Sequence, residues 1–134
     1  MLYLLDTDTL IYILKRRPPD VAARFEKMSP EDVAVSVISI AELMFGAEKS
    51  RSPARARRAV QKIAEVLRVL PFDEGAARVY GRLRARLEQR GTPIGALDTL
   101  IAAHALSLRA TLVTNNTREF ARDPDLEVEN WVGG

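Results

Sequence analysis

Cysteine is absent from the 134 residues of this chain, and long hydrophobic runs are lacking as well. Without cysteine there is no disulfide, thiolate nucleophile or cysteine-bound zinc or iron–sulfur cluster, so any metal must be held mainly by oxygen ligands. No apolar run approaches the ~18 residues of a membrane span, and the N-terminus lacks the features of a secretory signal. We therefore expect a cytoplasmic protein with no membrane association, in which Mg²⁺ or Mn²⁺ is the default metal.

The length and composition predict one folded domain over residues 1–134. A chain of this size can bury roughly two thirds of the surface that its unfolded form exposes. Hydrophobic residues make up 47% of the sequence and charged residues 28%, which is typical of a globular protein and not of a disordered or collagen-like one.

Basic residues are concentrated in the middle of the chain, although the net charge is only +2. Residues 49–90 contain 12 basic and 4 acidic side chains, and the remainder contains 8 basic and 14 acidic ones. Such a block is either the solvated face of amphipathic helices or a surface that binds phosphate groups. Charge alone leaves both interpretations open.

Apolar patterns along the chain alternate between strand and helix. Short runs rich in branched residues predict strands at 2–5, 33–38 and 111–114, with a further candidate at 127–132. Helical spacing and capping signals predict helices over 9–14, 20–28, 39–50, 53–67, 74–89 and 92–108. Strands separated by helices in this way indicate a single three-layer α/β/α domain with a mainly parallel sheet.

Polar side chains follow the predicted strands where ligands usually bind. Asp6 follows the first strand, Glu42 lies shortly after the second and Asn116 follows the third. Ligands of open parallel sheets bind beyond the carboxyl ends of the strands. Asp98 lies near the start of the helix that precedes the third strand, so it points back to the same edge. We expect these four side chains to share one cleft.

Each of these residues also has a purely structural interpretation. Asp6 is a candidate helix cap, worth about 1 kcal/mol, and Glu42 has the spacing of a capping-box acid after Ser39. Asp98 is harder to explain, because a carboxylate within an apolar helix is costly to bury without a partner. Carboxylates that repel one another require a compensating cation, so the combined pattern favours a metal site.

Four motifs in order along almost the whole chain resemble those of the PIN-domain ribonucleases, and specifically the VapC-type toxins of type II toxin–antitoxin systems. The motifs are Asp6-Thr7-Asp8, Ser39-x-x-Glu42-Leu43, Gly95-Ala-Leu-Asp98 and Leu112-Val-Thr-Asn-Asn-Thr-Arg-Glu-Phe120. Each motif is weak alone, but together they fall at the predicted strand ends with the expected order and spacing.

The resemblance implies a set of catalytic residues. Asp6, Glu42 and Asp98 match the acidic residues that bind the metal in the family. Asn116 falls where many members have a fourth aspartate; this departure leaves open whether one or two metal ions bind, and Glu119 is a further candidate through water. Hydrogen bonds that hold these carboxylates are expected from Thr7, Ser39 and Thr114.

The resemblance also implies an activity and partners. The expected enzyme is a Mg²⁺- or Mn²⁺-dependent endoribonuclease that cuts single-stranded or loop regions of RNA by in-line attack of water, leaving a 5′-phosphate and a 3′-hydroxyl. The basic block over 49–90 is then a candidate RNA-backbone surface. A VapB-type antitoxin and a second copy of the chain are the expected protein partners.

Two alternatives belong to other functional classes. The stretch Leu4-Leu5-Asp6-Thr7-Asp8-Thr9 also fits a haloacid-dehalogenase phosphatase, with Asp6 as nucleophile and Asp8 as general acid. That family needs a downstream lysine, and no lysine follows Lys62. A non-catalytic PIN-like module that binds RNA or protein would be expected to lack one or more of the core acids. His104 is expected to be a packing or surface residue and not a catalytic base.

Overall fold

The computed structural model of the chain describes residues 1–133; Gly134, the last residue of the predicted domain, lies outside the described residues. Within that range, five strands form one sheet in the order β3-β2-β1-β4-β5, and every neighbouring pair is parallel. The strands are β1 (Tyr3–Leu5), β2 (Val33–Ser36), β3 (Arg68–Leu70), β4 (Thr111–Val113) and β5 (Val128–Glu129). The prediction of a mainly parallel sheet is confirmed.

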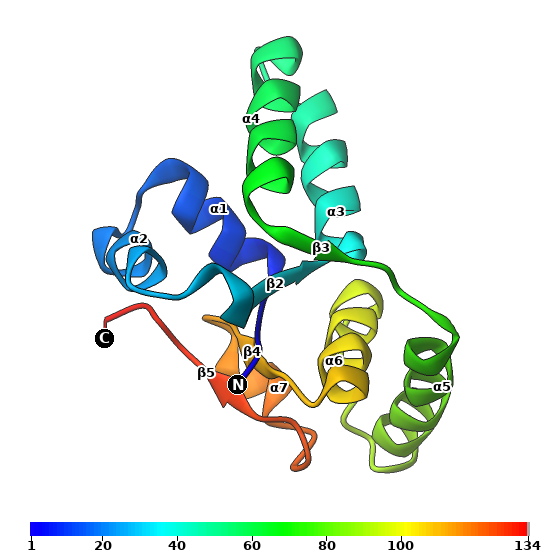
Figure 1. Ribbon diagram of the computed structural model, residues 1–134. Helices are drawn as coiled ribbons and strands as arrows, with labels where there is room; N and C mark the ends of the chain where they lie inside the picture. Colours follow the sequence, from blue (N-terminus) through cyan, green and yellow to red (C-terminus); the bar gives the residue numbers. More distant parts are fainter. Residues whose placement is uncertain (134) are drawn as a thin grey trace.

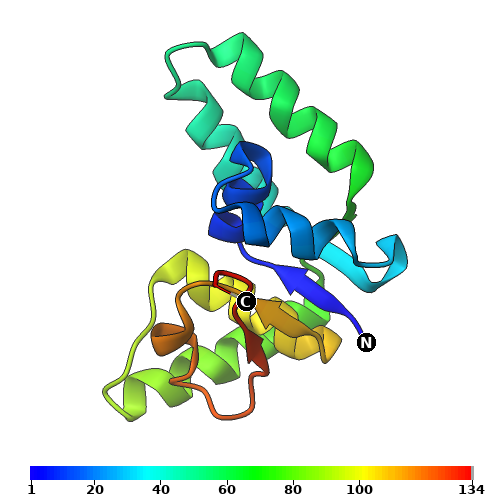
Figure 2. The ribbon, with the colours of Figure 1, turned by 90° about the vertical axis from the view of Figure 1, so that its left-hand side faces the viewer.

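Helices cover both faces of this sheet. They are α1 (Thr7–Lys15), α2 (Pro19–Glu26), α3 (Val37–Glu48), α4 (Pro53–Val66), α5 (Glu74–Gln89), α6 (Ala96–Leu108) and α7 (Thr117–Phe120), with a short 3₁₀ turn at Pro30–Asp32. Figure 2 shows the sheet between α1–α4 and α5–α7. None of the helices described in residues 1–133 is both long and apolar enough to cross a lipid bilayer.

Alternation along the central strand creates the two cores. Successive side chains of a strand point to opposite faces of the sheet. Leu5 accordingly packs in a cluster with residues of α1–α4, whereas Leu4 packs in a second cluster with residues of α5 and α6. Both side chains are fully buried. The predicted three-layer α/β/α architecture is therefore confirmed.

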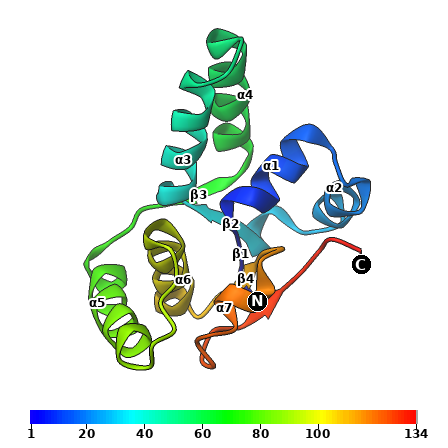
Figure 3. The same cartoon turned by 180° about the vertical axis from the view of Figure 1, so that it is seen from behind.

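Two helices extend beyond the sheet. The antiparallel pair α3 and α4 projects from the body of the molecule, at the top of Figures 1 and 3, and α5 lies beside α6 at the opposite end. The first turns of α3 remain close to β2, and the far end of the pair is surrounded by solvent. Its outer surface includes Met44 and Phe45, both of which are exposed apolar residues.

Strand β3 was not predicted from the sequence. Its residues Arg68–Leu70 continue the apolar spacing of the preceding helix, so the pattern suggested a helix to 67 followed by a break. The structure ends α4 at Val66 and pairs Val69 with Val35 of β2. Tertiary pairing at the sheet edge therefore overrides the local helical pattern.

Two predicted helix starts were wrong. Ser36, not Ser39, caps α3: its Oγ accepts a 3.1 Å hydrogen bond from Ile38 N, and Ser39 and Glu42 lie inside the helix. Helix α6 begins at Ala96 and not at Thr92, and residues 92–95 belong to no helix or strand. Asp98 is consequently the third residue of its helix, where a carboxylate also interacts favourably with the helix dipole.

Candidate active site

Strands β1 and β4 end level with each other, and the neighbouring β2 ends one residue later, at the edge where acidic residues were predicted to gather. Leu5 of β1 pairs with Val35 of β2 and with Val113 of β4. Asp6 and Thr114 therefore lie side by side, just beyond the carboxyl ends of β1 and β4. The chain reverses its direction of strand addition between these two strands, which is the usual ligand-binding position in an open parallel sheet.

Asp6 is held rigidly at this edge. It is 5% exposed, its backbone N donates to Val113 O over 3.0 Å, and its Oδ1 accepts a 2.8 Å hydrogen bond from Thr9 N, which caps α1. Burial raises the pKa of Asp6, and hydrogen bonds from the side chains of Thr114 and Thr9 oppose that rise. Asp6 can therefore cap α1 and also take part in the predicted site, because the cap bond uses only one of its two carboxylate oxygens.

Glu42 faces the same edge from the second turn of α3. Its Oε1 accepts a 2.6 Å hydrogen bond from Thr7 Oγ1, and Ser39 Oγ lies 3.1 Å from the same Thr7 oxygen. Ser39 is buried, whereas Thr7 and Glu42 are partly exposed. The structure therefore brings Glu42 together with two of the three hydroxyl groups that were expected to support the carboxylates.

Asp98 completes a cluster of negative charge. Its pKa is raised from 3.8 to about 6, first by burial and then by the charges of Glu119, Glu42, Asp6 and Asp8. Mutual repulsion of this kind requires the carboxylates to lie near one another in a partly dehydrated setting. Three of the four predicted positions, Asp6, Glu42 and Asp98, therefore share one acidic region, to which Asp8 and Glu119 also contribute.

Asn116 and Glu119 border the cluster from the segment after β4. Asn116 Nδ2 donates a 2.6 Å hydrogen bond to Glu119 Oε2, and Gly95 N donates a 3.1 Å bond to Glu119 Oε1. A side-chain carbon placed on Gly95 would lie 3.8 Å from both Asp98 Oδ2 and Glu119 Oε1, so these carboxylates approach the same short stretch of backbone. The sequence indicated Glu119 only through its place in a motif; its contact with Gly95 depends on the loop before α6.

The donor set suits a hard divalent cation. Within residues 1–133, Asp6, Glu42, Asp98 and Glu119 form no ion pair with lysine or arginine at the site, so their charge is uncompensated. In the same range no three acidic or histidine side chains are close enough to form a ready metal-binding group. Thr7 donates to only one carboxylate oxygen of Glu42, whereas both oxygens of Glu119 already accept hydrogen bonds, from Gly95 N and Asn116 Nδ2.

His104 lies outside this cluster, as predicted. It is buried in α6, its Nδ1 lies 2.8 Å from Ser36 Oγ, and its ring packs edge-on against Phe72 with centroids 5.4 Å apart. Burial lowers its pKa, partly opposed by the charge of Asp73 and a hydrogen bond with the backbone of Pro71. The residue joins α6 to the end of β2.

Comparison with known proteins identifies the family. Residues 3–125 match the PIN domain family. The chain is 40% identical over 129 residues to the tRNA(fMet)-specific endonuclease VapC of Salmonella typhimurium, spanning 96% of this chain and 97% of that protein. It is 42% identical over 130 residues to ribonuclease VapC2 of Haemophilus influenzae, spanning 97% and 98% of the two chains.

Solved structures agree. DNA-bound VapBC from Salmonella typhimurium contains a chain with a TM-score of 0.91 and 41% identity, covering 98% of this chain and 99% of that one. VapBC-1 from nontypeable Haemophilus influenzae gives a TM-score of 0.89 and 40% identity, with 98% of each chain covered. The fold, the strand-end acids and these relatives agree: the chain belongs to the PIN-domain family, in its VapC ribonuclease branch.

Proposed function

We propose that this protein is the ribonuclease toxin of a toxin–antitoxin pair and that it hydrolyses RNA phosphodiester bonds with the help of Mg²⁺ or Mn²⁺. The main support for this proposal is the group of acidic residues Asp6, Glu42 and Asp98, which lies where β1 and β4 end in register. Among the described residues, none of the three forms an ion pair with a lysine or arginine. Oxygen ligands without sulfur or an accompanying imidazole favour hard cations.

Each acidic residue has a separate task in this proposal. Asp6 and Asp98 hold the ion. Asp6 does so through Oδ2, the carboxylate oxygen that does not accept the cap bond from Thr9 N. Glu42, positioned by Thr7, completes the ligand set or orients the attacking water. When bound, the divalent ion supplies a Lewis acid that lowers the pKa of water and offsets charge on the phosphoryl oxygens.

Asn116 makes this site differ from relatives with a fourth aspartate. Its amide carries no charge and donates to Glu119, so it holds Glu119 in place without adding to the repulsion. We propose one well-held ion, with Asn116 and Glu119 acting on the water or RNA side of the site.

The RNA backbone follows the basic face of α4 in this proposal. Arg55, Arg58 and Lys62 lie three and four residues apart, are exposed and line one hollow of the helix surface. Two arginines of α5 are less available, since Arg78 and Arg84 are paired with Glu74 and Glu88. Phosphate binding to α4 should be sensitive to salt.

The partners follow from the relatives. Structural relatives from Salmonella and Haemophilus are VapBC assemblies, so we propose that a VapB-type antitoxin binds and inhibits this chain. The association of two copies of the chain is a separate proposal, which rests on the family resemblance alone. The Salmonella relative is named as specific for tRNA(fMet), which makes that tRNA the first substrate to test. We propose that the enzyme acts in the cytoplasm, where such RNA is found.

The phosphatase alternative is not supported. Its proposed general acid, Asp8, lies exposed in the first turn of α1, and the family match is to the PIN domain. The non-catalytic alternative is weakened because Asp6, Glu42 and Asp98 are all present at the sheet edge.

Cleavage of purified tRNA tests the proposal. The protein should cut tRNA(fMet) in Mg²⁺ or Mn²⁺ faster than elongator tRNAs and should stop when EDTA is added. Asp6→Asn and Asp98→Asn should each abolish cleavage while the circular dichroism spectrum stays unchanged. Full activity in both folded variants would refute the site assignment. Undiminished cleavage in EDTA would refute the metal requirement alone.

A further inference from the structure

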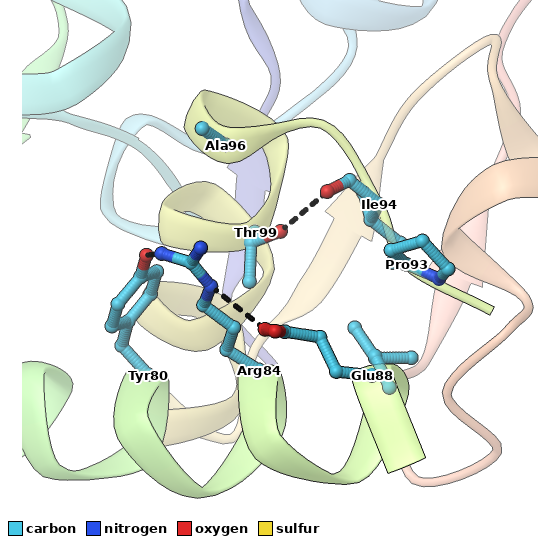
Figure 4. A pocket seen from close by; sticks show the side chains of 8 residues that line it. Tyr80, Arg84, Glu88, Pro93, Ile94, Ala96 and Thr99 are labelled. Carbon is cyan, nitrogen blue, oxygen red and sulfur yellow. Dashed lines mark hydrogen bonds and ion pairs between the residues drawn. The ribbon is translucent and has the colours of Figure 1, made fainter. Parts of the chain in front are cut away.

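A pocket of about 340 Å³ lies between α5, the start of α6 and the loop that joins them (Figure 4). Ligand sites usually measure roughly 300–1,000 Å³, so this one has room for a single small group. The side chains that carry its chemistry are Tyr80, Arg84, Glu88, Pro93, Ile94 and Thr99.

The charge of Arg84 is already paired with that of Glu88, and Arg84 also donates to the hydroxyl group of Tyr80. Arg84 Nε donates a 3.1 Å hydrogen bond to Glu88 Oε2, and Arg84 Nη1 donates a 2.9 Å bond to Tyr80 OH. Figure 4 shows the guanidinium group between these two partners and beside Thr99. A paired arginine is a poor site for a free phosphate, but its planar group still offers a stacking surface and donor hydrogens.

The opposite wall is apolar and held in place. It consists of Pro93 and Ile94 (Figure 4), and the backbone carbonyl groups of both residues accept hydrogen bonds. Arg122 Nη1 donates a 2.5 Å hydrogen bond to Pro93 O, and Thr99 Oγ1 donates a 3.2 Å bond to Ile94 O. Hydrogen bonds within the protein thus hold the backbone of this wall.

The pocket adjoins the acidic cluster. Thr99 follows Asp98 directly in α6, and Gly95, next to Ile94, is bonded to Glu119. A side-chain carbon placed on Gly95 would lie 3.8 Å from both Asp98 Oδ2 and Glu119 Oε1, and Gly95 stands between the pocket residues Ile94 and Ala96. The pocket and the acidic cluster therefore adjoin the same short stretch of backbone.

We infer that this pocket receives one unstacked nucleobase of the RNA, from a nucleotide that flanks the bond to be cut. The inference rests on the proposed ribonuclease function and adds a determinant of sequence preference to it. A nucleobase is planar and neutral and carries both donors and acceptors, which matches an aromatic ring, a paired guanidinium group, a carboxylate and an apolar wall. Single-stranded RNA is recognised through such splayed bases.

The basic face of α4 has the opposite chemistry. The hollow lined by Arg55, Arg58 and Lys62 contains three cationic side chains, one carboxylate (Glu65) and no aromatic ring, which suits the backbone and not a base. The two surfaces thus divide the recognition of RNA between phosphates and one base.

The test uses RNA hairpins with randomised loops, cut by the full-length protein and sequenced. Tyr80→Leu keeps an apolar side chain but removes the aromatic ring. Glu88→Gln replaces a carboxylate, which only accepts hydrogen bonds, by a neutral amide, which both donates and accepts them. Tyr80→Leu should reduce kcat/KM for the preferred loops about tenfold, the value expected when one stacking interaction is removed, and flatten the preference at one position. Glu88→Gln should change the preferred base at that same position.

A matched control lies on the same helix. Glu74 pairs with Arg78 over 2.9 Å with the same four-residue spacing, away from the pocket. Glu74→Gln should leave the loop preferences unchanged. A second readout is independent of cleavage: 2-aminopurine placed at the preferred position should be quenched on binding to Asp98→Asn protein, and Tyr80→Leu should relieve the quenching.

The possible outcomes distinguish failure of the base-pocket inference from failure of the proposed ribonuclease function. If the wild type cuts hairpins and both pocket variants keep its preference at every position, the inference is wrong and the ribonuclease stands. If the variants change self-association or antitoxin affinity with unchanged preference, the pocket serves a protein partner and the inference is again wrong. If the wild type neither binds nor cuts RNA, the proposed function itself fails.

Discussion

Thr7 Oγ1 donates a 2.6 Å hydrogen bond to Glu42 Oε1 and thereby connects the start of α1 to α3 across the acidic cluster. The two residues are 35 positions apart in the chain. Thr7 directly follows Asp6, so this single hydrogen bond places Glu42 relative to the end of β1. Hydrogen bonds of this kind orient the ligands of metal sites.

Removal of the Thr7 hydroxyl should therefore weaken catalysis more than stability. We expect Thr7→Val to lower kcat/KM for RNA by about 10- to 100-fold, as is usual when a supporting partner of a metal ligand is removed. Thr7→Ser keeps the hydroxyl and should retain most activity. Equal rates for the wild type and the valine variant would show that Glu42 does not depend on this bond.

Asp98 should destabilise the metal-free protein at neutral pH. Its folded-state pKa of about 6 exceeds the ordinary value of 3.8, so the folded state binds the proton more tightly and loses stability as the pH rises through this window. Asp98→Asn removes this loss. After allowance for solvent screening, we expect a gain of about 1 kcal/mol at neutral pH.

Urea denaturation in EDTA measures the effect. The stability advantage of Asp98→Asn should shrink as the pH falls from above 6 toward 3.8, because the wild-type carboxyl then becomes protonated in both states. An advantage that stays constant over this range would mean that the charge of Asp98 is not its cause. Saturating Mg²⁺ should reverse the order, since a ligand stabilises only the protein that binds it.

The basic face of α4 should account for part of the salt dependence of RNA binding. Replacing Arg55, Arg58 and Lys62 by alanine should reduce the slope of log K against log salt by about 2, from roughly 0.7 for each phosphate that these side chains no longer neutralise. Filter binding with the inactive Asp98→Asn background avoids cleavage. Arg57→Ala is the control, because Arg57 is paired with Glu48 over 2.6 Å and should change the slope little.

His104 should make the protein less stable in mild acid. Its pKa is lowered from 6.5 by burial, so the unfolded state binds the proton more tightly and stability falls as the pH drops below 6.5. His104→Gln lacks this titration. The difference in unfolding free energy between wild type and variant should therefore vary with pH below 6.5 and be constant above it; a difference that is constant throughout would contradict this assignment.

The sequence predicted the sheet and its acidic edge where local pattern and tertiary structure agree. The apolar runs that became β1 and β4 are followed by polar residues, so their ends could be located closely and Asp6 placed beyond one of them. The run that contains β2 continues through Val37 and Ile38, so the predicted strand was two residues too long at the start of α3. Asp98 was recognised because a carboxylate within an apolar helix is costly to bury without a binding partner. These signals are carried by residues close together in the chain.

The remaining features depend on contacts between distant residues. Strand β3 exists because Val69 pairs with Val35, and no local pattern distinguishes it from the end of a helix. The hydrogen bond of Glu119 to Gly95 spans 24 residues and depends on the path of the loop before α6. Ser36 and Ser39 are equally good caps by type, and only packing selects the first.

The level ends of β1 and β4 make the acidic site dependent on strand alignment. Side chains alternate between faces, so a slip of β1 by one residue against β4 would exchange the environments of Leu4 and Leu5 and turn Asp6 away from Asp98. Such a slip would also move Tyr3 or Asp6 into a position that a fully buried leucine now fills, so the apolar core and the catalytic geometry would be disturbed together. The packing of the apolar core thus favours a single register of β1 against β4. The same register brings the acidic residues together, so core packing and site geometry are selected by the same strand alignment.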